Sequence, residues 1–233
     1  MKTLQQDPLS YTIPPALTKR SQAKRALILT AAMRYFAEHG YEAARVGDIA
    51  AELGIAKGSV FQHFGSKDGL FVEAYKEAVA GLPGYLEVPD EVKNRGFFAI
   101  LRYRLENAGR VREHHDVQYK VMLLGNYGSD MNIKKRLSLY LKQEDPLELK
   151  TFVKLGLDRG ELRRDVDPEL IASVIESVVE RFQDSLAMSE MHPELFRSPS
   201  NGHAQGGHGH QIEEFMLVLR GAVGAAHAAK ATV

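Results

Sequence analysis

The chain of 233 residues is long enough for one large or two small domains, and its 44% hydrophobic and 26% charged residues are ordinary for a soluble globular protein. It has no cysteine, which excludes disulfides, thiolate metal ligands and cysteine nucleophiles. The formal net charge is zero, and the sequence shows neither a long apolar run nor an apolar signal segment, so a cytoplasmic protein outside the membrane is predicted.

The charge is unevenly distributed. Between Lys19 and Lys67, eight basic and four acidic residues leave +4, so the rest of the chain carries −4. A basic N-terminal part joined to an acidic remainder suits an anionic partner for the first part alone. An ordinary solvated surface can carry the same excess of basic residues, so the charge distribution alone does not establish an anionic partner.

Helical periodicity begins after an N-terminal arm. Residues 1–17 contain three prolines and no periodic pattern, which predicts a flexible arm. Apolar residues at helical spacing predict a first helix over about 18–39, ended by Gly40. A very short second helix is predicted over 48–53, closed by Gly54.

A third short helix is predicted within GIAKGSVFQHFGSKDGL, residues 54–70. Val60 and Phe64 are four residues apart, so on a helix they share the face that meets a core. The polar residues between them are displayed on the other side. Ser66 is the predicted N-cap of a fourth helix that runs toward Gly81.

The breaker-rich segment GLPGYLEVPD, residues 81–90, separates this N-terminal unit from the remainder. No alternating strand pattern is present, so the fold class predicted for the whole chain is all-α. The predicted domains are an arm (1–17), an N-terminal unit (18–80) and a larger helical unit (81–233) with a flexible loop at about 192–211. Further helices are predicted over 91–109, 114–127, 129–142, 146–159, 168–188 and 212–229.

Two short helices joined by a tight turn at 53–55 indicate a helix-turn-helix, whose second helix enters the major groove of DNA. Lys57 and Lys67 flank that helix and can neutralise phosphates, and Gly58 lets the backbone approach DNA closely. Gln62 is the candidate reader of a base edge, because its amide can form two hydrogen bonds with adenine. Patterning alone does not distinguish this arrangement from a helical hairpin with a polar face.

The segment ILTAAMRYFAEHGYEAARVGDIAAELGIAKGSVFQHFGSKDGLF, residues 28–71, closely resembles the DNA-binding head of TetR-family transcriptional repressors. The family pattern has a first helix ending in Phe-x-x-x-Gly-Tyr, then Asp-Ile-Ala, then Gly-Val-Ser-Lys-Gly-Thr-Leu-Tyr-x-His-Phe, then Ser-Lys-Glu-x-Leu. A fainter match, GELRRDVDPELIASVI, resembles the entry to a dimerisation helix in that family. The matching positions of the head are Phe36, Gly40, Tyr41, Asp48, Ile49, Ala50, Gly54, Lys57, Gly58, His63, Phe64, Ser66, Lys67 and Leu70.

The resemblance implies a homodimeric regulator, usually a repressor, that binds a pseudo-palindromic DNA operator and is released by a small-molecule effector. Its motif and the chemistry of the displayed side chains predict DNA contacts from Arg45, Lys57, Gly58, Ser59, Phe61, Gln62, His63 and Lys67. The departures from the pattern bear on operator sequence and affinity: Ala44 and Arg45 replace a capping Thr or Ser, Ala56 replaces Ser, Phe61 replaces Tyr, and Gly69 weakens the first turn of the fourth helix.

The remainder of the chain is expected to hold the effector site and the dimer interface. The last two helices carry long apolar faces whose natural use is an antiparallel four-helix interface; the alternative is that they are core helices within one chain. The predicted interface residues are Ile171, Val174, Val178, Phe182, Phe215, Leu219 and Ala222. The candidate effector contacts on the middle helices are Tyr103, His115, Tyr119, Met122 and Tyr127.

Other classes of function are less well supported. An enzyme is not predicted, because no nucleophile–base pair, paired carboxylates or metal cluster stands at the required spacing. His203, His208 and His210 lie in a Gly-rich run that can bind metal only weakly, so no metal or other cofactor is predicted. A constitutive or architectural DNA-binding protein without an effector is the alternative to a ligand-responsive regulator.

Overall fold

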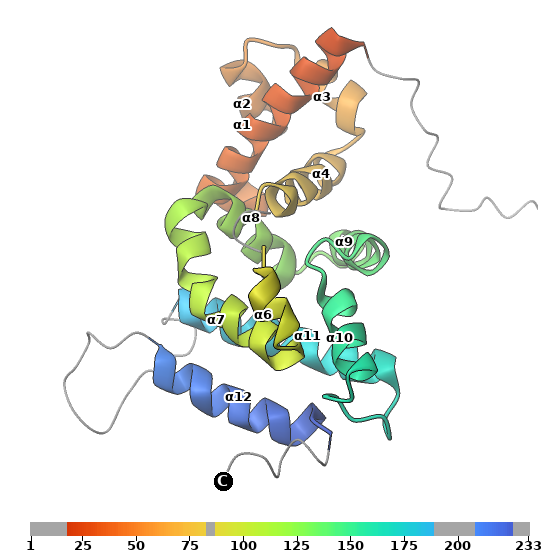
Figure 1. Cartoon of the computed structure of the whole chain (residues 1–233). Helices are drawn as coiled ribbons and strands as arrows, with labels where there is room; N and C mark the ends of the chain where they lie inside the picture. Colours follow the sequence, from red (N-terminus) through yellow and green to blue (C-terminus); the bar gives the residue numbers. More distant parts are fainter. Residues whose placement is uncertain (1–17, 83–86, 189–207, 226–233) are drawn as a thin grey trace, which may run out of the picture.

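The computed structural model describes residues 18–82, 87–188 and 208–225. Figure 1 shows an elongated molecule, with a head formed by the first helices at one end and α12 at the other. Apart from one isolated bridge between Leu162 and Gly224, the regular structure of the described chain is helical, which confirms the all-α class. The helices are α1 (Lys19–Ala43), α2 (Val46–Glu52), α3 (Lys57–Phe64), α4 (Lys67–Ala80), α6 (Asp90–Asn94), α7 (Phe97–His114), α8 (Asp116–Tyr127), α9 (Met131–Glu144), α10 (Leu149–Asp158), α11 (Pro168–Ala187) and α12 (Gly209–Val223).

The head is a three-helix unit, α1 to α3, closed by α4. Gly40 adopts a φ of 74° inside α1, so the regular helix breaks where it was predicted to end and resumes for one short stretch to Ala43. The aromatic rings of Phe36, Tyr41 and Phe71 meet around this break and join α1 to α4. The predicted second helix begins two residues earlier than expected, at Val46.

The junction between α3 and α4 is unusually close. Ser66 caps α4 as predicted, since its hydroxyl accepts a hydrogen bond from the Gly69 N–H at 3.0 Å. A Cβ at Gly69 would lie 2.0 Å from the carbonyl oxygen of Phe64, the last residue of α3. Glycine is therefore needed at position 69 to bring the two helices together, although it is a poor residue for a first helical turn.

The body differs from the predicted segments at two places. The expected helix over 91–109 is split by Gly96, whose φ is 99°, into α6 and a longer α7. The Glu161 carboxylate accepts a hydrogen bond from the Phe97 N–H at 3.1 Å, which supports the first turn of α7 from across the fold. Asp167 caps α11 as its sequence indicates, whereas α12 starts at Gly209 and ends at Val223, before the predicted boundary.

Two apolar clusters make up the core. The first joins the head to α8 and α9, because Val121, Ile133 and Leu137 pack with the buried residues of α1 and α4. The second surrounds α7, which lies against α10, α11 and α12. The head is therefore seated on the body mainly through α1 and α4, which both pack against α8. The predicted arm (1–17) and most of the predicted loop at 192–211 lie outside the described residues.

Candidate nucleic-acid interface and body cavity

Helix α3 displays the side chains that the sequence assigned to DNA. Val60 and Phe64 are buried and fix the helix against the head core. Lys57, Gly58 and Gln62 are exposed on its other side. The connection from α2 turns at Gly54, whose φ of 63° is a left-handed conformation that favours glycine. This geometry is the helix-turn-helix predicted from the sequence.

The remaining predicted DNA contacts are less uniform in exposure. Arg45 is exposed at the start of α2, where its side chain makes no cap hydrogen bond. Ser59, Phe61 and His63 are half-buried. The Lys57 ammonium lies 5.6 Å from the centre of the Phe61 ring, so the lysine stem covers part of this apolar side chain.

Lys67 has partners within the head. Its ammonium donates a hydrogen bond to the Glu42 carbonyl at 3.0 Å and lies 4.6 Å from the centre of the Tyr41 ring. The Tyr41 hydroxyl in turn donates to Asp68 at 2.7 Å. The predicted phosphate ligand therefore also joins the end of α1 to the start of α4.

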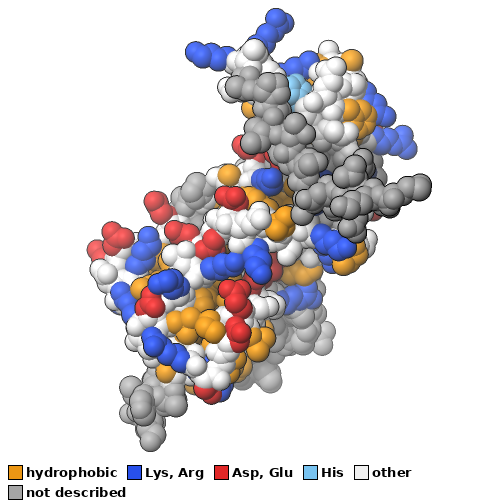
Figure 2. Space-filling model, turned by 90° about the vertical axis from the view of Figure 1, so that its right-hand side faces the viewer, with side chains coloured by type: hydrophobic (Ala, Val, Ile, Leu, Met, Phe, Trp, Pro, Cys, Tyr) orange, Lys and Arg blue, Asp and Glu red, His pale blue; other side chains and the backbone are white. Residues whose placement is uncertain are grey.

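Two cations on α1, Lys24 and Arg25, lie close enough to His63 to affect its pKa, and neither is among the predicted DNA contacts. Burial lowers the pKa of His63, and the nearby charges of Lys24 and Arg25 lower it further, so His63 is neutral at pH 7. A neutral imidazole offers one donor and one acceptor to a base or phosphate. Figure 2 shows Lys and Arg side chains gathered around the head end of the molecule.

One of these cations, Arg25, helps to hold the helices of the head together. The Arg25 guanidinium pairs with Glu73 at 2.5 Å and lies 4.9 Å from the centre of the Phe64 ring. It therefore holds α1, α3 and α4 at one point. A second ion pair, between Arg34 and Glu52, joins α1 to α2. Sequence spacing gives no hint that residues 24 and 25 approach position 63.

The body contains a cavity of about 130 Å³ between α4, α7, α8, α10 and α11. Of the predicted effector contacts, Tyr119 and Met122 line it, whereas Tyr103, His115 and Tyr127 are not among its lining residues. The lining also includes residues that sequence reasoning did not single out, notably Tyr75, Asn126, Phe152, Asp184 and Arg104.

The predicted dimer residues divide between two environments. Val174, Val178 and Ala222 are exposed, and Phe215 is half-buried. Ile171, Phe182 and Leu219 are buried in the body core, and the rings of Phe182 and Phe215 stack with centroids 4.0 Å apart. The exposed large apolar side chains of α11 and α12 are Leu170, Val174, Val178, Leu217 and Val218.

Over residues 18–82, 87–188 and 208–225, no three His, Cys, Asp or Glu side chains come together as a metal site, and His203 lies outside these ranges. None of the helices in the described ranges is both long and apolar enough to cross a membrane.

Comparison with known proteins agrees with this geometry. Residues 28–74 match the family model for bacterial regulatory proteins of the tetR family. The chain is 28% identical over 166 residues to the HTH-type transcriptional repressor AcnR of Corynebacterium glutamicum, an alignment that covers 70% of this chain and 81% of that repressor. It is 29% identical over 170 residues to another HTH-type transcriptional repressor, from Mycobacterium tuberculosis, with 67% of this chain and 91% of the relative covered.

The fold is also similar to that of a solved transcriptional regulator. The crystal structure of the transcriptional regulator FadR from Bacillus subtilis in complex with stearoyl-CoA superposes with a TM-score of 0.59 at 17% identity, covering 83% of this chain and 96% of that one. These relatives are transcriptional regulators rather than enzymes. The helix-turn-helix, the family match and the shared fold together make the chain a transcriptional regulator of the TetR family.

Proposed function

We propose that the chain is a homodimeric repressor that binds an inverted-repeat operator and releases it when a small molecule enters the body cavity. The observation that carries this proposal is the position of Tyr75. It belongs to α4, which packs against the recognition helix, and its buried side chain also lines the cavity. A molecule in the cavity therefore touches a helix of the head.

Hydrogen bonds continue from Tyr75 into the body. Its hydroxyl donates to the Asn126 side chain at 3.0 Å, and the Asn126 amide donates to the Glu180 carboxylate. The wall of the cavity thus connects α4, α8 and α11. The packing is tight, since a Cβ at Gly125 would lie 2.5 Å from the Tyr75 ring.

This connection supplies a route for regulation. A ligand that displaces the Tyr75 ring moves α4, and with it the head, relative to α11. Such a ligand releases DNA only if it binds the DNA-incompetent arrangement of the heads more tightly than the competent one. A constitutive or architectural protein needs no such cavity beside its head.

The exposed apolar side chains of α11 and α12 support a dimer. Leu170, Val174 and Val178 stand four residues apart and form one stripe on α11, and Leu217 and Val218 are the exposed apolar pair of α12. Exposed apolar side chains of this kind favour association, and a two-fold axis lets the same two helices cover each other. Each of the two heads in the dimer can then bind one half-site of the operator.

Selection of duplexes from a random pool by the purified full-length chain tests the proposal. A dimer of heads should enrich an inverted repeat, with half-site centres about one helical turn, or a multiple of it, apart. Enrichment of a single half-site or of a direct repeat would contradict the dimer. Equal binding of all duplexes with a steep salt dependence would instead favour the architectural alternative.

A further inference from the structure

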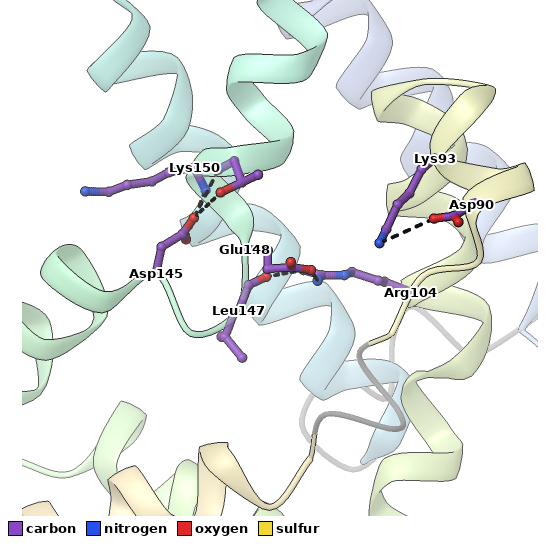
Figure 3. A network of polar contacts seen from close by, with 8 residues as sticks. Asp90, Lys93, Arg104, Asp145, Leu147, Glu148 and Lys150 are labelled. Atoms are coloured by element: carbon purple, nitrogen blue, oxygen red, sulfur yellow. Dashed lines mark hydrogen bonds and ion pairs between the residues drawn. The ribbon is translucent and has the colours of Figure 1, made fainter.

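Arg104 is a cation buried in the wall of the cavity. Its side chain leaves α7, is 12% exposed, and lies with its guanidinium carbon 4.6 Å from the centre of the Phe152 ring. Figure 3 shows it pointing toward the connection between α9 and α10, which carries Leu147 and Glu148. Burial lowers the pKa of Arg104 to about 10, so the side chain is still charged at neutral pH.

The guanidinium has more donors than partners. Its Nη1 donates to the Leu147 carbonyl at 2.5 Å. Its Nε and Nη2 are buried without a hydrogen-bond partner. In the part of the chain that the structure describes, no other buried side-chain nitrogen or oxygen lacks one. The Glu148 carboxylate forms an ion pair with Nη2 at 3.8 Å, a distance too long for a hydrogen bond, and it is half exposed to solvent.

A buried guanidinium with two unpartnered N–H groups favours an anionic ligand. A buried charge is normally retained only where it is paired and hydrogen-bonded. The two unpartnered nitrogens, Nε and Nη2, are adjacent and present parallel N–H groups, the fork that receives both oxygens of one carboxylate. Among the residues that the structure describes, Glu148 forms an ion pair with Nη2 but accepts no hydrogen bond from this fork.

The acidic side chains of the same cavity are differently placed. Asp184 already accepts hydrogen bonds from two tyrosine hydroxyls, at 2.9 and 2.7 Å, and Glu180 accepts one from the Asn126 amide. Asp145 accepts hydrogen bonds from the N–H groups of residues 150 and 151 in the first turn of α10. Glu176 is exposed. These carboxylates already accept hydrogen bonds or face solvent. None of them is a buried, unpartnered group that would favour a cationic ligand.

The rest of the cavity limits the size and polarity of its occupant. Leu101, Val111, Met122 and Phe152 contribute apolar walls. The volume of about 130 Å³ is close to the roughly 150 Å³ of an engineered apolar cavity that holds benzene. A larger hollow of about 440 Å³ adjoins it between α8, α9, α10 and α11. The two share the lining residues Asn126, Leu141, Asp145, Leu149, Glu176 and Glu180.

We propose that the cavity binds a small organic monocarboxylate whose carboxylate pairs with Nε and Nη2 of Arg104 and whose apolar body lies along α7. The inference rests on the cavity's role as the effector site and names the chemical class of the effector. It assigns Arg104 as the residue that selects the anion.

A charge series on one ring tests this assignment. Benzoate, benzamide and benzylamine share a phenyl ring and carry charges of −1, 0 and +1 at pH 7. Isothermal titration calorimetry on the full-length chain, without DNA, should find benzoate bound more tightly than benzamide by about tenfold or more, and benzylamine bound most weakly. Hexanoate and octanoate extend the series to flexible apolar bodies.

Variants locate the selectivity. Arg104→Met should bind benzoate no better than benzamide, and Arg104→Lys should keep part of the preference because it retains a charge without the fork. Arg110→Met is the matched control, since Arg110 is an exposed arginine on the same helix, and it should behave as the unmodified chain. The comparison of the three probes on the unmodified chain needs no variant to fold.

Several results would overturn the proposal. These are equal binding of benzoate and benzamide, benzoate binding that survives Arg104→Met, or no binding of any carboxylate at millimolar concentration. Tightest binding of benzylamine would instead assign the site to the α11 carboxylates. Because calorimetry uses protein without DNA, such a failure leaves operator binding untouched, whereas a failed duplex selection leaves the carboxylate result standing.

Discussion

Replacing Leu217 and Val218 by glutamate should abolish the dimer while leaving each chain folded. Both side chains are largely exposed in the single chain, at 74% and 72%, so their replacement removes little of the chain's own core. Full burial of a Leu or Val side chain is worth about 1.5–3 kcal/mol, so the exposed three quarters are worth about 1–2 kcal/mol each. A two-fold interface buries four such side chains, which gives about 4 kcal/mol or more and raises the dimer dissociation constant by about 10³-fold or more.

Sedimentation velocity at micromolar concentration measures this change, with circular dichroism to show that the helices persist. Met131→Glu is the control, because Met131 is 62% exposed but belongs to α9 rather than to α11 or α12. Phe215→Glu would be a less specific test, since that ring stacks on Phe182 within the chain. A double variant that stays dimeric would show that the surface of α11 and α12 is not the interface.

Other substitutions test the head and the cavity separately. Gln62→Ala should cost about 1–3 kcal/mol on the cognate duplex and flatten the preference at one base pair, as binding to cognate and scrambled DNA will show, whereas equal losses on both would refute base reading. Lys67→Ala should weaken all duplexes alike and lower the salt slope by roughly 1; an unchanged slope would assign Lys67 only to its contacts within the head. Gly69→Ala should destabilise the fold by about 1–3 kcal/mol in chemical denaturation because its Cβ meets a carbonyl, while Gly58→Ala, which has open space, should weaken DNA binding without loss of stability. Burial raises the pKa of Asp184, despite hydrogen bonds that lower it, so the unmodified chain loses stability as pH rises above the ordinary aspartate range. The free energy of unfolding of Asp184→Asn, relative to that of the unmodified chain, should therefore increase from pH 4 to pH 7. A constant difference would contradict the burial argument.

The local features of the head could be predicted because they depend on neighbours in sequence. Val60 and Phe64 are buried because they are one helical turn apart, and Ser66 caps α4 through a hydrogen bond to a residue three positions on. Gly69 shows the limit of such reasoning. It weakens a first helical turn in isolation, yet it is required by the approach of a carbonyl from another helix.

The features of the cavity could not be predicted in the same way. Arg104 belongs to a helix with several exposed charges, where an arginine normally extends to solvent, and it is buried only because α10 packs against α7. Tyr75 has the spacing of an ordinary core residue, and its place in the cavity wall depends on the packing of α4 against α8. Both positions follow from contacts between segments far apart in the chain.

The affinity of the full-length chain for its selected duplex, compared with the same duplex after one half-site is scrambled, tests the central claim most directly. A dimer that places one recognition helix in each half-site should lose about 10²-fold or more, because each mismatched base pair costs about 1–3 kcal/mol. Fluorescence anisotropy at fixed salt measures both affinities. Equal affinity for the two duplexes would contradict the claim that two heads read the operator together.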